Sequence, residues 1–193
     1  SWLYPVTQGA TSIWERWNSY TVENGYGGNN GMNSFNHYSL GAVGAWMMGY
    51  QVGIQRDDTA GFQSFELQPT PGGSFTYTNG SYESDYGTIV SNWTADQGEL
   101  TSYEAVVPAN TTATLYLPVS EEAVADFTAI DGITYVGMEE HNGQMTAKFN
   151  LEAGGYNFSL QDGKLVASIA DGYVADETET ADKGILNSVI EYA

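Results

Sequence analysis

The chain has 193 residues, of which 24 are acidic and five are basic, so its formal net charge is −19. This charge repels phosphate backbones and anionic lipid, which argues against nucleic acids and membrane surfaces as partners and favours a neutral partner such as a sugar. The hydrophobic fraction of 41% suffices for a buried core, and the absence of cysteine excludes disulfides and thiolate metal sites. We find no run of about 18 apolar residues, so we expect no membrane insertion. We also expect no cofactor and no structural metal.

Two helices are predicted in the first quarter of the chain. In "TSIWERW", Ser12 and Glu15 have the S-x-x-E spacing of a capping box, which predicts a short helix beginning there. After a loop rich in glycine and asparagine, residues 33–53 carry apolar side chains three and four positions apart, which predicts an amphipathic helix. The predicted buried stripe of this helix is Val43, Trp46, Met47, Tyr50 and Ile54.

The pattern changes to a period of two after residue 60. Asn79-Gly80 in "FTYTNGSYES" and Asn142-Gly143 in "MEEHNGQMTAKFNL" each separate two alternating runs, which predicts two β-hairpins. With further alternating runs, we expect eight or more short strands without helices between them. This pattern is typical of an antiparallel β-sandwich, and we expect a jelly-roll-like architecture. One face of a single strand should carry Met145, Ala147, Phe149 and Leu151.

The end of the chain has a different composition. "ADGYVADETETADK" has the acidic, threonine-rich character of a linker, and "ADKGILNSVIEYA" has the pattern of a helix that begins near the end of the chain. We therefore predict three regions: helices in residues 1–56, a β-sandwich in 57–168, and a linker with the start of a helical module in 169–193. Because two amphipathic helices cannot enclose a core alone, we expect the chain to be part of a longer protein.

Five stretches of the sequence, in order, resemble one enzyme family. "SWLYPVTQGATSIWERWNS" and "GMNSFNHYSLGAVGAWMMGYQVGI" resemble the end of the catalytic domain of bacterial α-L-rhamnosidases, glycoside hydrolase family 78. The similarity continues through "GFQSFELQPTPGG", "SYESDYGTIVSNW" and "VPANTTATLYLP", over roughly residues 1–118. The resemblance implies the last helices of an α/α toroid, followed by a supporting sandwich. It also implies a parent enzyme that removes terminal α-L-rhamnose, with inversion, from a rhamnose-containing glycoside or polysaccharide.

The same resemblance implies roles for four residues. Glu15 of "SIWE" falls on the glutamate understood to be the family's general base, and His37 of "MNSFNHY" falls on a sugar-pocket histidine. Trp14 and Trp17 are the local candidates for stacking on a sugar. The family's general acid, a glutamate in an upstream motif, has no counterpart in this chain. Inversion needs two carboxyl groups about 6.5–9.5 Å apart. We therefore expect that the chain depends on an upstream catalytic domain of the same protein and is inactive alone.

These functional interpretations have structural alternatives. A helix cap would also explain the spacing around Glu15. His37 and Asn33 could instead serve to close the preceding loop. A second class of function is a non-catalytic carbohydrate-binding or structural sandwich. That class would need outward-facing aromatic residues, for which the candidates are Tyr77, Tyr82, Tyr86, Trp93 and Tyr103.

The last residues bear on the location of the protein. "TADKGILNSVIEYA" resembles the first helix of the three-helix FIVAR modules in surface proteins of Gram-positive bacteria. The resemblance implies a secreted or cell-surface protein. A cytoplasmic location is the alternative, since the first ten residues do not have the pattern of a signal peptide.

Overall fold

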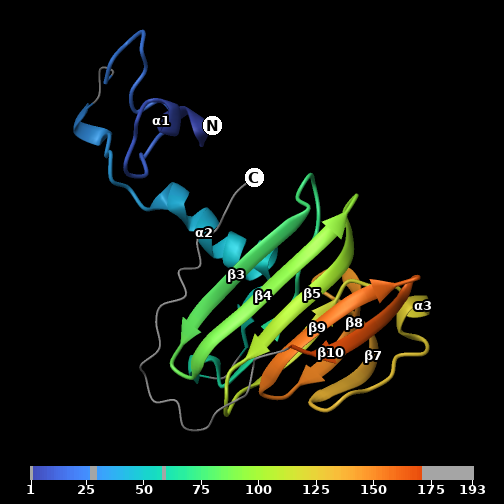
Figure 1. Ribbon diagram of the computed structural model, residues 1–193. Helices are drawn as coiled ribbons and strands as arrows, with labels where there is room; N and C mark the ends of the chain where they lie inside the picture. The colour runs from blue at the N-terminus through green and yellow to red at the C-terminus, as the bar shows by residue number, and fades with distance from the viewer. Residues whose placement is uncertain (1, 27–29, 58–59, 171–193) are drawn as a thin grey trace. The chain divides into compact units, whose positions relative to one another are not determined.

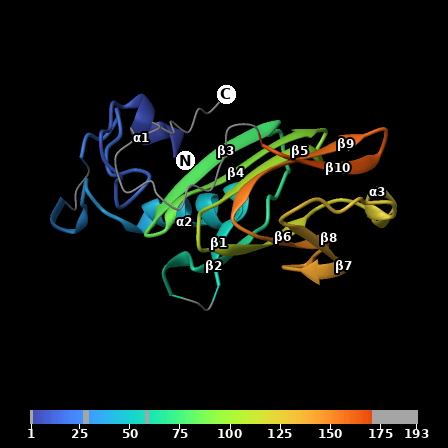
Figure 2. The same ribbon diagram turned by 60° about the horizontal axis from the view of Figure 1, so that its bottom comes forward.

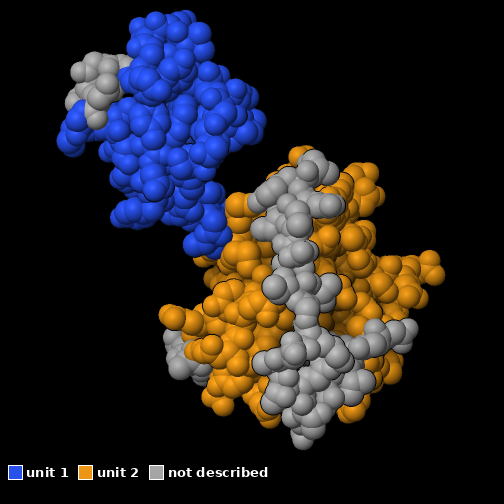
Figure 3. Space-filling model, turned by 60° about the vertical axis from the view of Figure 1, so that its left-hand side comes forward, with its two compact units in different colours: residues 1–46 blue, residues 47–193 orange. Residues whose placement is uncertain are grey.

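The structure is a computed structural model that describes residues 2–26, 30–57 and 60–170. It contains two compact units, residues 1–46 and 47–193 (Figure 3). The predicted linker and terminal helix lie almost wholly outside the described residues. In the described part of the chain, no helix is both long enough and apolar enough to cross a membrane.

The second unit is a β-sandwich of two five-stranded sheets, which form separate layers (Figures 1 and 2). In spatial order, one sheet contains β1 (Ile54–Arg56), β2 (Ser64–Leu67), β6 (Thr112–Leu117), β8 (Gln144–Leu151) and β7 (Ile133–His141). The other contains β10 (Lys164–Ile169), β9 (Gly154–Gln161), β5 (Glu99–Val107), β4 (Gly87–Asp96) and β3 (Tyr77–Ser84). The predicted sandwich is confirmed, although it begins at residue 54, slightly before the expected start at 57.

Two details of the sandwich differ from the sequence-based expectation. Strands β2 and β6 pair in parallel, whereas the other neighbouring pairs are antiparallel. Short helical turns also interrupt the strands: the 3₁₀ turn η4 (Ala60–Phe62) and the helix α3 (Glu121–Val124). A parallel pair is possible here because β2 and β6 are far apart in sequence and are not joined by a hairpin.

The core lies between the two sheets. Phe149 of β8 contacts Phe158 of β9 across the layers, with ring centroids 5.5 Å apart. Ala147, Phe149 and Leu151 share the buried face of β8, as predicted, whereas Met145 beside the hairpin is 56% exposed. Alternation along the strands therefore identifies the inward side chains, except where a strand extends past the layer that covers it.

Three hairpins use two-residue turns in which both residues have positive φ. The turn at Asn142-Gly143 has φ values of 50° and 79° and connects β7 to β8, which confirms the prediction. Gln97-Gly98 and Asp162-Gly163 have the same geometry between β4 and β5 and between β9 and β10. This turn type matches the right-handed twist of the paired strands, and glycine at the second position adopts it without steric cost.

Asn79-Gly80, by contrast, is not a turn. Both residues lie inside β3, opposite Asn92 and Ser91 of β4, and the connection to β4 is at residues 85–86. A Cβ on Gly80 would lie 2.3 Å from a methyl carbon of Val52. Glycine is therefore required at this position by the close approach of Val52, and the predicted hairpin turn at Asn79-Gly80 was wrong.

The helical segment before the sandwich is shorter than predicted and changes type along its length. It consists of the 3₁₀ turn η2 (Ser39–Ala42), the helix α2 (Val43–Trp46) and the π-helix η3 (Met47–Val52), and residues 33–38 are not helical. Among its described residues, the first unit also contains the helix α1 (Leu3–Thr7) and the turn η1 (Asn30–Met32). Residues 11–17 contain no helix, so the short helix predicted at "TSIWERW" was wrong.

The buried side of this helical segment also differs from the prediction. Val52 is 3% exposed and Met48 packs against the core, whereas Trp46 is 52% exposed and Tyr50 is 46% exposed. Met47 is half-buried. The assignment of Trp46, Met47 and Tyr50 to the core was therefore wrong, because positions four apart, 48 and 52, form the stripe that meets the sandwich.

The last carbonyl groups of η3 are bonded to side chains on the inner face of the second sheet. Trp93 Nε1 donates to the Gln51 carbonyl at 2.7 Å, and the Ser91 hydroxyl donates to the Val52 carbonyl at 2.7 Å. The Tyr103 hydroxyl lies 3.0 Å from Ser91 Oγ. Burial raises the pKa of the Tyr103 phenol far above its usual range, so this hydroxyl stays protonated within the network. We call these three side chains the helix-end clamp.

We predict that Gly80→Ala destabilises the sandwich by about 1–3 kcal/mol, because the added methyl overlaps Val52. Urea denaturation measures the effect. In a Val52→Ala background the same change should cost much less. Gly72→Ala is the matched control, since its Cβ meets open space. Equal effects of the Gly80 and Gly72 changes would contradict the packing argument.

We also predict that Ser91→Ala lowers the free energy of unfolding by about 1–3 kcal/mol, because it leaves the buried Val52 carbonyl without its donor. Ser168→Ala, on the exposed surface of β10, should change it by less than about 0.5 kcal/mol. The measurement is thermal or urea unfolding of both variants. A Ser91 variant as stable as the Ser168 variant would show that the clamp contributes nothing.

Candidate functional site

The residues of "TSIWERW" form an extended segment that pairs with residues 34–37. The Glu15 N–H donates to the Ser34 carbonyl at 2.9 Å, and the His37 N–H donates to the Ile13 carbonyl at 2.8 Å. The Ser12 hydroxyl donates to the Phe35 carbonyl, in place of a helix cap. This pairing brings the segments of the two principal predicted site residues, Glu15 and His37, side by side.

The Glu15 carboxylate is fixed by one hydrogen bond. Its Oε2 accepts from the Ser34 N–H at 2.7 Å, and the side chain is half-buried. Among the described residues, none donates to the second oxygen, Oε1. The capping-box alternative for Glu15 is therefore wrong, because its carboxylate binds a distant backbone amide and caps no helix. A positioned carboxylate with one available oxygen has the form that proton abstraction requires.

His37 lies two residues before the helical segment, which begins at Ser39. Its Nδ1 accepts a hydrogen bond from the Ser39 N–H at 3.3 Å, and its ring lies parallel to that of Tyr38, with centroids 5.5 Å apart. Since Nδ1 is an acceptor, the neutral ring carries its proton on Nε2, where it can be donated to a ligand. Asn33, rather than His37, closes the preceding loop, because its Nδ2 donates to the Ser19 carbonyl at 2.9 Å.

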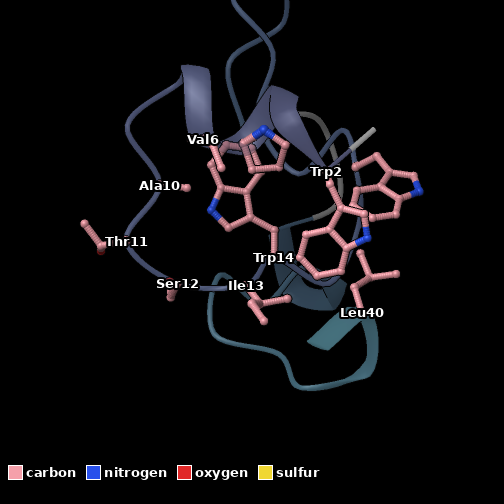
Figure 4. A pocket seen from close by; sticks show the side chains of 10 residues that line it. Trp2, Val6, Ala10, Thr11, Ser12, Ile13, Trp14 and Leu40 are labelled. Atoms are coloured by element: carbon pink, nitrogen blue, oxygen red, sulfur yellow. The ribbon is translucent and has the colours of Figure 1, made fainter. Parts of the chain in front are cut away.

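The two tryptophans differ in exposure. Trp14 is 7% exposed and meets Phe35 edge-on with ring centroids 5.3 Å apart, whereas Trp17 is 38% exposed and meets Trp2 at 5.2 Å. Both line a cavity of about 240 Å³ together with Trp2, Ile13 and Leu40 (Figure 4). Glu15 and His37 do not line this cavity. Trp14 thus serves mainly to pack the paired segments, and Trp17 retains ring surface for a further contact.

The first unit exposes most of its large apolar side chains. Among its described residues, Pro5 and Trp14 alone are buried apolar residues. The exposed set, which we call the apolar surface of the first unit, is Trp2, Leu3, Val6, Trp17, Val22, Tyr26, Met32, Tyr38, Val43 and Trp46. This unit has too little buried apolar area to enclose a core, and exposed surface of this kind marks a packing interface.

In the sandwich, two of the five aromatic candidates for sugar binding lie inside the core. Trp93 and Tyr103 are each 1% exposed, whereas Tyr82 and Tyr86 are 41% and 37% exposed. The rings of Trp93 and Tyr103 therefore cannot contact a ligand, because they are buried between the two sheets. Inward and outward positions depend on strand register, so these two burials were not predicted.

A cluster of polar and aromatic residues that was not predicted lies on the sheet that contains β2, β6, β7 and β8. The His141 ring lies flat on Tyr116 with centroids 3.6 Å apart, and its Nε2 is 3.2 Å from Glu66 Oε2. Burial, followed by the charge of Glu66, raises the pKa of Tyr116. The hydrogen bond from Lys148 Nζ to Glu139, at 2.8 Å, raises the pKa of Lys148. These residues come from four strands, so no local motif connects them.

Comparison with known families matches the two units to two domains of one class of enzyme. Residues 1–50 match the family described as the bacterial α-L-rhamnosidase 6-hairpin glycosidase domain. Residues 53–128 match the family described as the bacterial α-L-rhamnosidase C-terminal domain. The class is therefore that of glycoside hydrolases with a six-hairpin catalytic domain. The chain belongs to the bacterial α-L-rhamnosidase family.

Individual relatives agree with this assignment. The chain is 41% identical to an α-L-rhamnosidase of Formosa agariphila over 61% of its length, and 31% identical to one of Alteromonas sp. over 83%. The crystal structure of Streptomyces avermitilis α-L-rhamnosidase complexed with L-rhamnose matches 83% of the chain at a TM-score of 0.64 and 30% identity. The chain spans only 12%, 16% and 15% of the length of these three proteins.

We predict that Trp14→Ala loosens the paired segments, whereas Trp17→Ala does not. Removal of a buried aromatic ring leaves a cavity, so exchange of the Glu15 and His37 backbone amides should accelerate by more than about tenfold in the Trp14 variant. Hydrogen exchange of the chain measures this directly. If both variants accelerate exchange equally, Trp14 has no special packing role.

Proposed function

We propose that the protein containing this chain removes terminal α-L-rhamnose from glycosides with inversion, and that Glu15 is its general base. The observation that carries the proposal is the Glu15 carboxylate, which Ser34 holds through Oε2 while Oε1 stays available. The relatives named α-L-rhamnosidases support the reaction, and the Streptomyces structure with L-rhamnose supports the sugar.

In this proposal the carboxylate activates water. Oε1 of Glu15 takes a proton from a water molecule as that water attacks the anomeric carbon of the rhamnose. The hydrogen bond from the Ser34 N–H to Oε2 keeps the carboxylate in one orientation. A second carboxyl group, about 6.5–9.5 Å away, donates a proton to the leaving oxygen. That acid belongs to a preceding part of the same protein.

His37 and Trp17 contact the sugar in this proposal. The Nε2 of His37 is free of the bond that occupies Nδ1, so it donates to a rhamnose hydroxyl. The half-exposed ring of Trp17 offers a flat apolar surface to the sugar ring. Trp14 acts indirectly, since its own ring is buried against Phe35.

The partner of the chain is the rest of the catalytic domain. We propose that helical hairpins preceding these residues pack on the apolar surface of the first unit, which supplies the core that this unit lacks. The substrate is a rhamnose-containing glycoside or polysaccharide. Without the preceding hairpins the acid is missing, so the chain alone should not hydrolyse rhamnosides.

We predict that Glu15→Gln in the full-length enzyme lowers kcat by about 10²–10⁴-fold with a smaller change in KM, because general base assistance is lost. Hydrolysis of an aryl rhamnoside and the melting temperature are measured on the same variant. The matched control is Glu23→Gln, an exposed glutamate of the same unit that should leave kcat unchanged.

A purely structural role for Glu15 gives a different result. Glutamine keeps an oxygen that can accept from the Ser34 N–H, so the stability would then change by less than about 1 kcal/mol and turnover would stay nearly intact. Near-normal turnover of the Gln variant, or rhamnoside hydrolysis by the isolated chain, would overturn the assignment.

A further inference from the structure

A row of polar side chains crosses the outer face of the sheet that contains β3, β4, β5 and β9. Asn79 pairs in register with Asn92, Asn92 with Glu104, and Glu104 with Asn157. Three spacings between strands give the row a length of roughly 14 Å. Figure 1 looks onto this sheet. We call these four residues the polar row.

The polar row points away from the core. Its members alternate along the strands with Trp93, Tyr103 and Phe158, each of which is 1% exposed between the sheets. Because successive side chains of a strand lie on opposite faces, the polar row lies on the solvent side. Asn79 and Asn157, at its ends, are exposed, and the two central members are half-buried.

The centre of the row is fixed by hydrogen bonds, and its ends are available. Asn92 Nδ2 donates to Glu104 Oε2 at 2.7 Å, and Asn92 Oδ1 accepts from the Gly80 N–H at 3.0 Å. The side-chain amides of Asn79 and Asn157 form no hydrogen bond with any other described residue. The row therefore combines an ordered carboxylate at its centre with two unoccupied carboxamides at its ends.

A second row of hydroxyl groups runs beside the first. Thr94, Ser102 and Ser159 are also cross-strand partners, and Thr94 Oγ1 lies 2.6 Å from Ser102 Oγ. Residues of both rows line an open cavity of about 320 Å³. The cavity thus presents carboxamide, carboxylate and hydroxyl groups over the width of four strands.

The lining determines the chemistry of a ligand. Among the described residues that line the cavity, Glu104 is the one charged group, with no lysine or arginine to bind an anion. The net charge of −19 repels phosphates and uronates further. One carboxylate is too few for a dedicated calcium site, which uses several charged or carbonyl oxygens. Sugar hydroxyls, which both donate and accept, match these groups best.

We propose that the polar row is a binding site for a neutral oligosaccharide, separate from Glu15 and from the hydrolytic reaction. Its length suits several consecutive sugar units rather than one. Such a site would hold a neutral glycan chain on the sandwich, where Asn79 and Asn157 bind its hydroxyls from the two ends and Glu104 from the centre.

Side-chain amide resonances of the intact 193-residue chain test this proposal. The probe is a neutral tetrasaccharide with a terminal L-rhamnose, compared with L-rhamnose and with tetragalacturonate as an anionic tetrasaccharide. We expect saturable shifts of the Asn79, Asn92 and Asn157 amides with the neutral tetrasaccharide, and at least about tenfold weaker binding of the other two.

Variants distinguish the site from a solvated sheet surface. The double variant Asn79→Ala/Asn157→Ala should weaken binding of the neutral tetrasaccharide at least about tenfold, while keeping the wild-type near-ultraviolet circular dichroism. Asn150→Ala, exposed on the outer face of the other sheet, is the matched control and should bind as wild type.

The proposal would be overturned if these amides showed no saturable shift at 10 mM tetrasaccharide, roughly the weakest affinity of a useful site. Equal binding by the double variant and the wild type would overturn it as well. Shifts confined to residues 13–37 would also overturn it, and would instead support sugar contacts near Glu15. Hydrolysis by the full-length Glu15 variant is a separate measurement, so either proposal can fail alone.

Discussion

The second unit depends on how its helical segment ends. A helix leaves its last carbonyl groups without partners, and burial makes this costly. Here Trp93 and Ser91 donate to the carbonyls of Gln51 and Val52, and Ser91 is itself bonded to Tyr103. These donors are buried in the core of the sandwich, so the packing of the sheet and the satisfaction of the helix end depend on the same side chains. Gly80 completes the arrangement, because any side chain there would displace Val52.

Along the chain, a short series of hydrogen bonds leads from the residues of the proposed site to the start of this helical segment. The helical segment held by the clamp begins at Ser39, whose N–H is bonded to His37, and His37 is bonded in turn to Ile13 beside Glu15. The sandwich thus fixes the last residues of this helical segment, Gln51 and Val52. The secreted or cell-surface location rests on residues beyond 170 and stays a prediction.

The sequence allowed most of the sandwich to be predicted, because period-two alternation and Asn142-Gly143 report local geometry. The predictions were wrong where a residue distant in the sequence determines the local structure. Gly80 was interpreted as a turn, yet it makes room for Val52. The S-x-x-E spacing predicted a helix cap, yet Glu15 pairs with Ser34. Trp46 was assigned to the core by spacing alone, which cannot tell which side of a helix is covered. The polar row required the register of four strands, and no single segment of sequence contains it.

The central claim is that Glu15 activates water on the face of the sugar opposite the leaving group. The most direct test follows the first product of the full-length enzyme by proton nuclear magnetic resonance, before the anomers equilibrate. An α-L-rhamnoside should release β-L-rhamnose first, because a single displacement by water inverts the anomeric carbon. Initial release of α-L-rhamnose would reveal a covalent intermediate and a double displacement, and would contradict the role of Glu15 as a general base for direct attack by water.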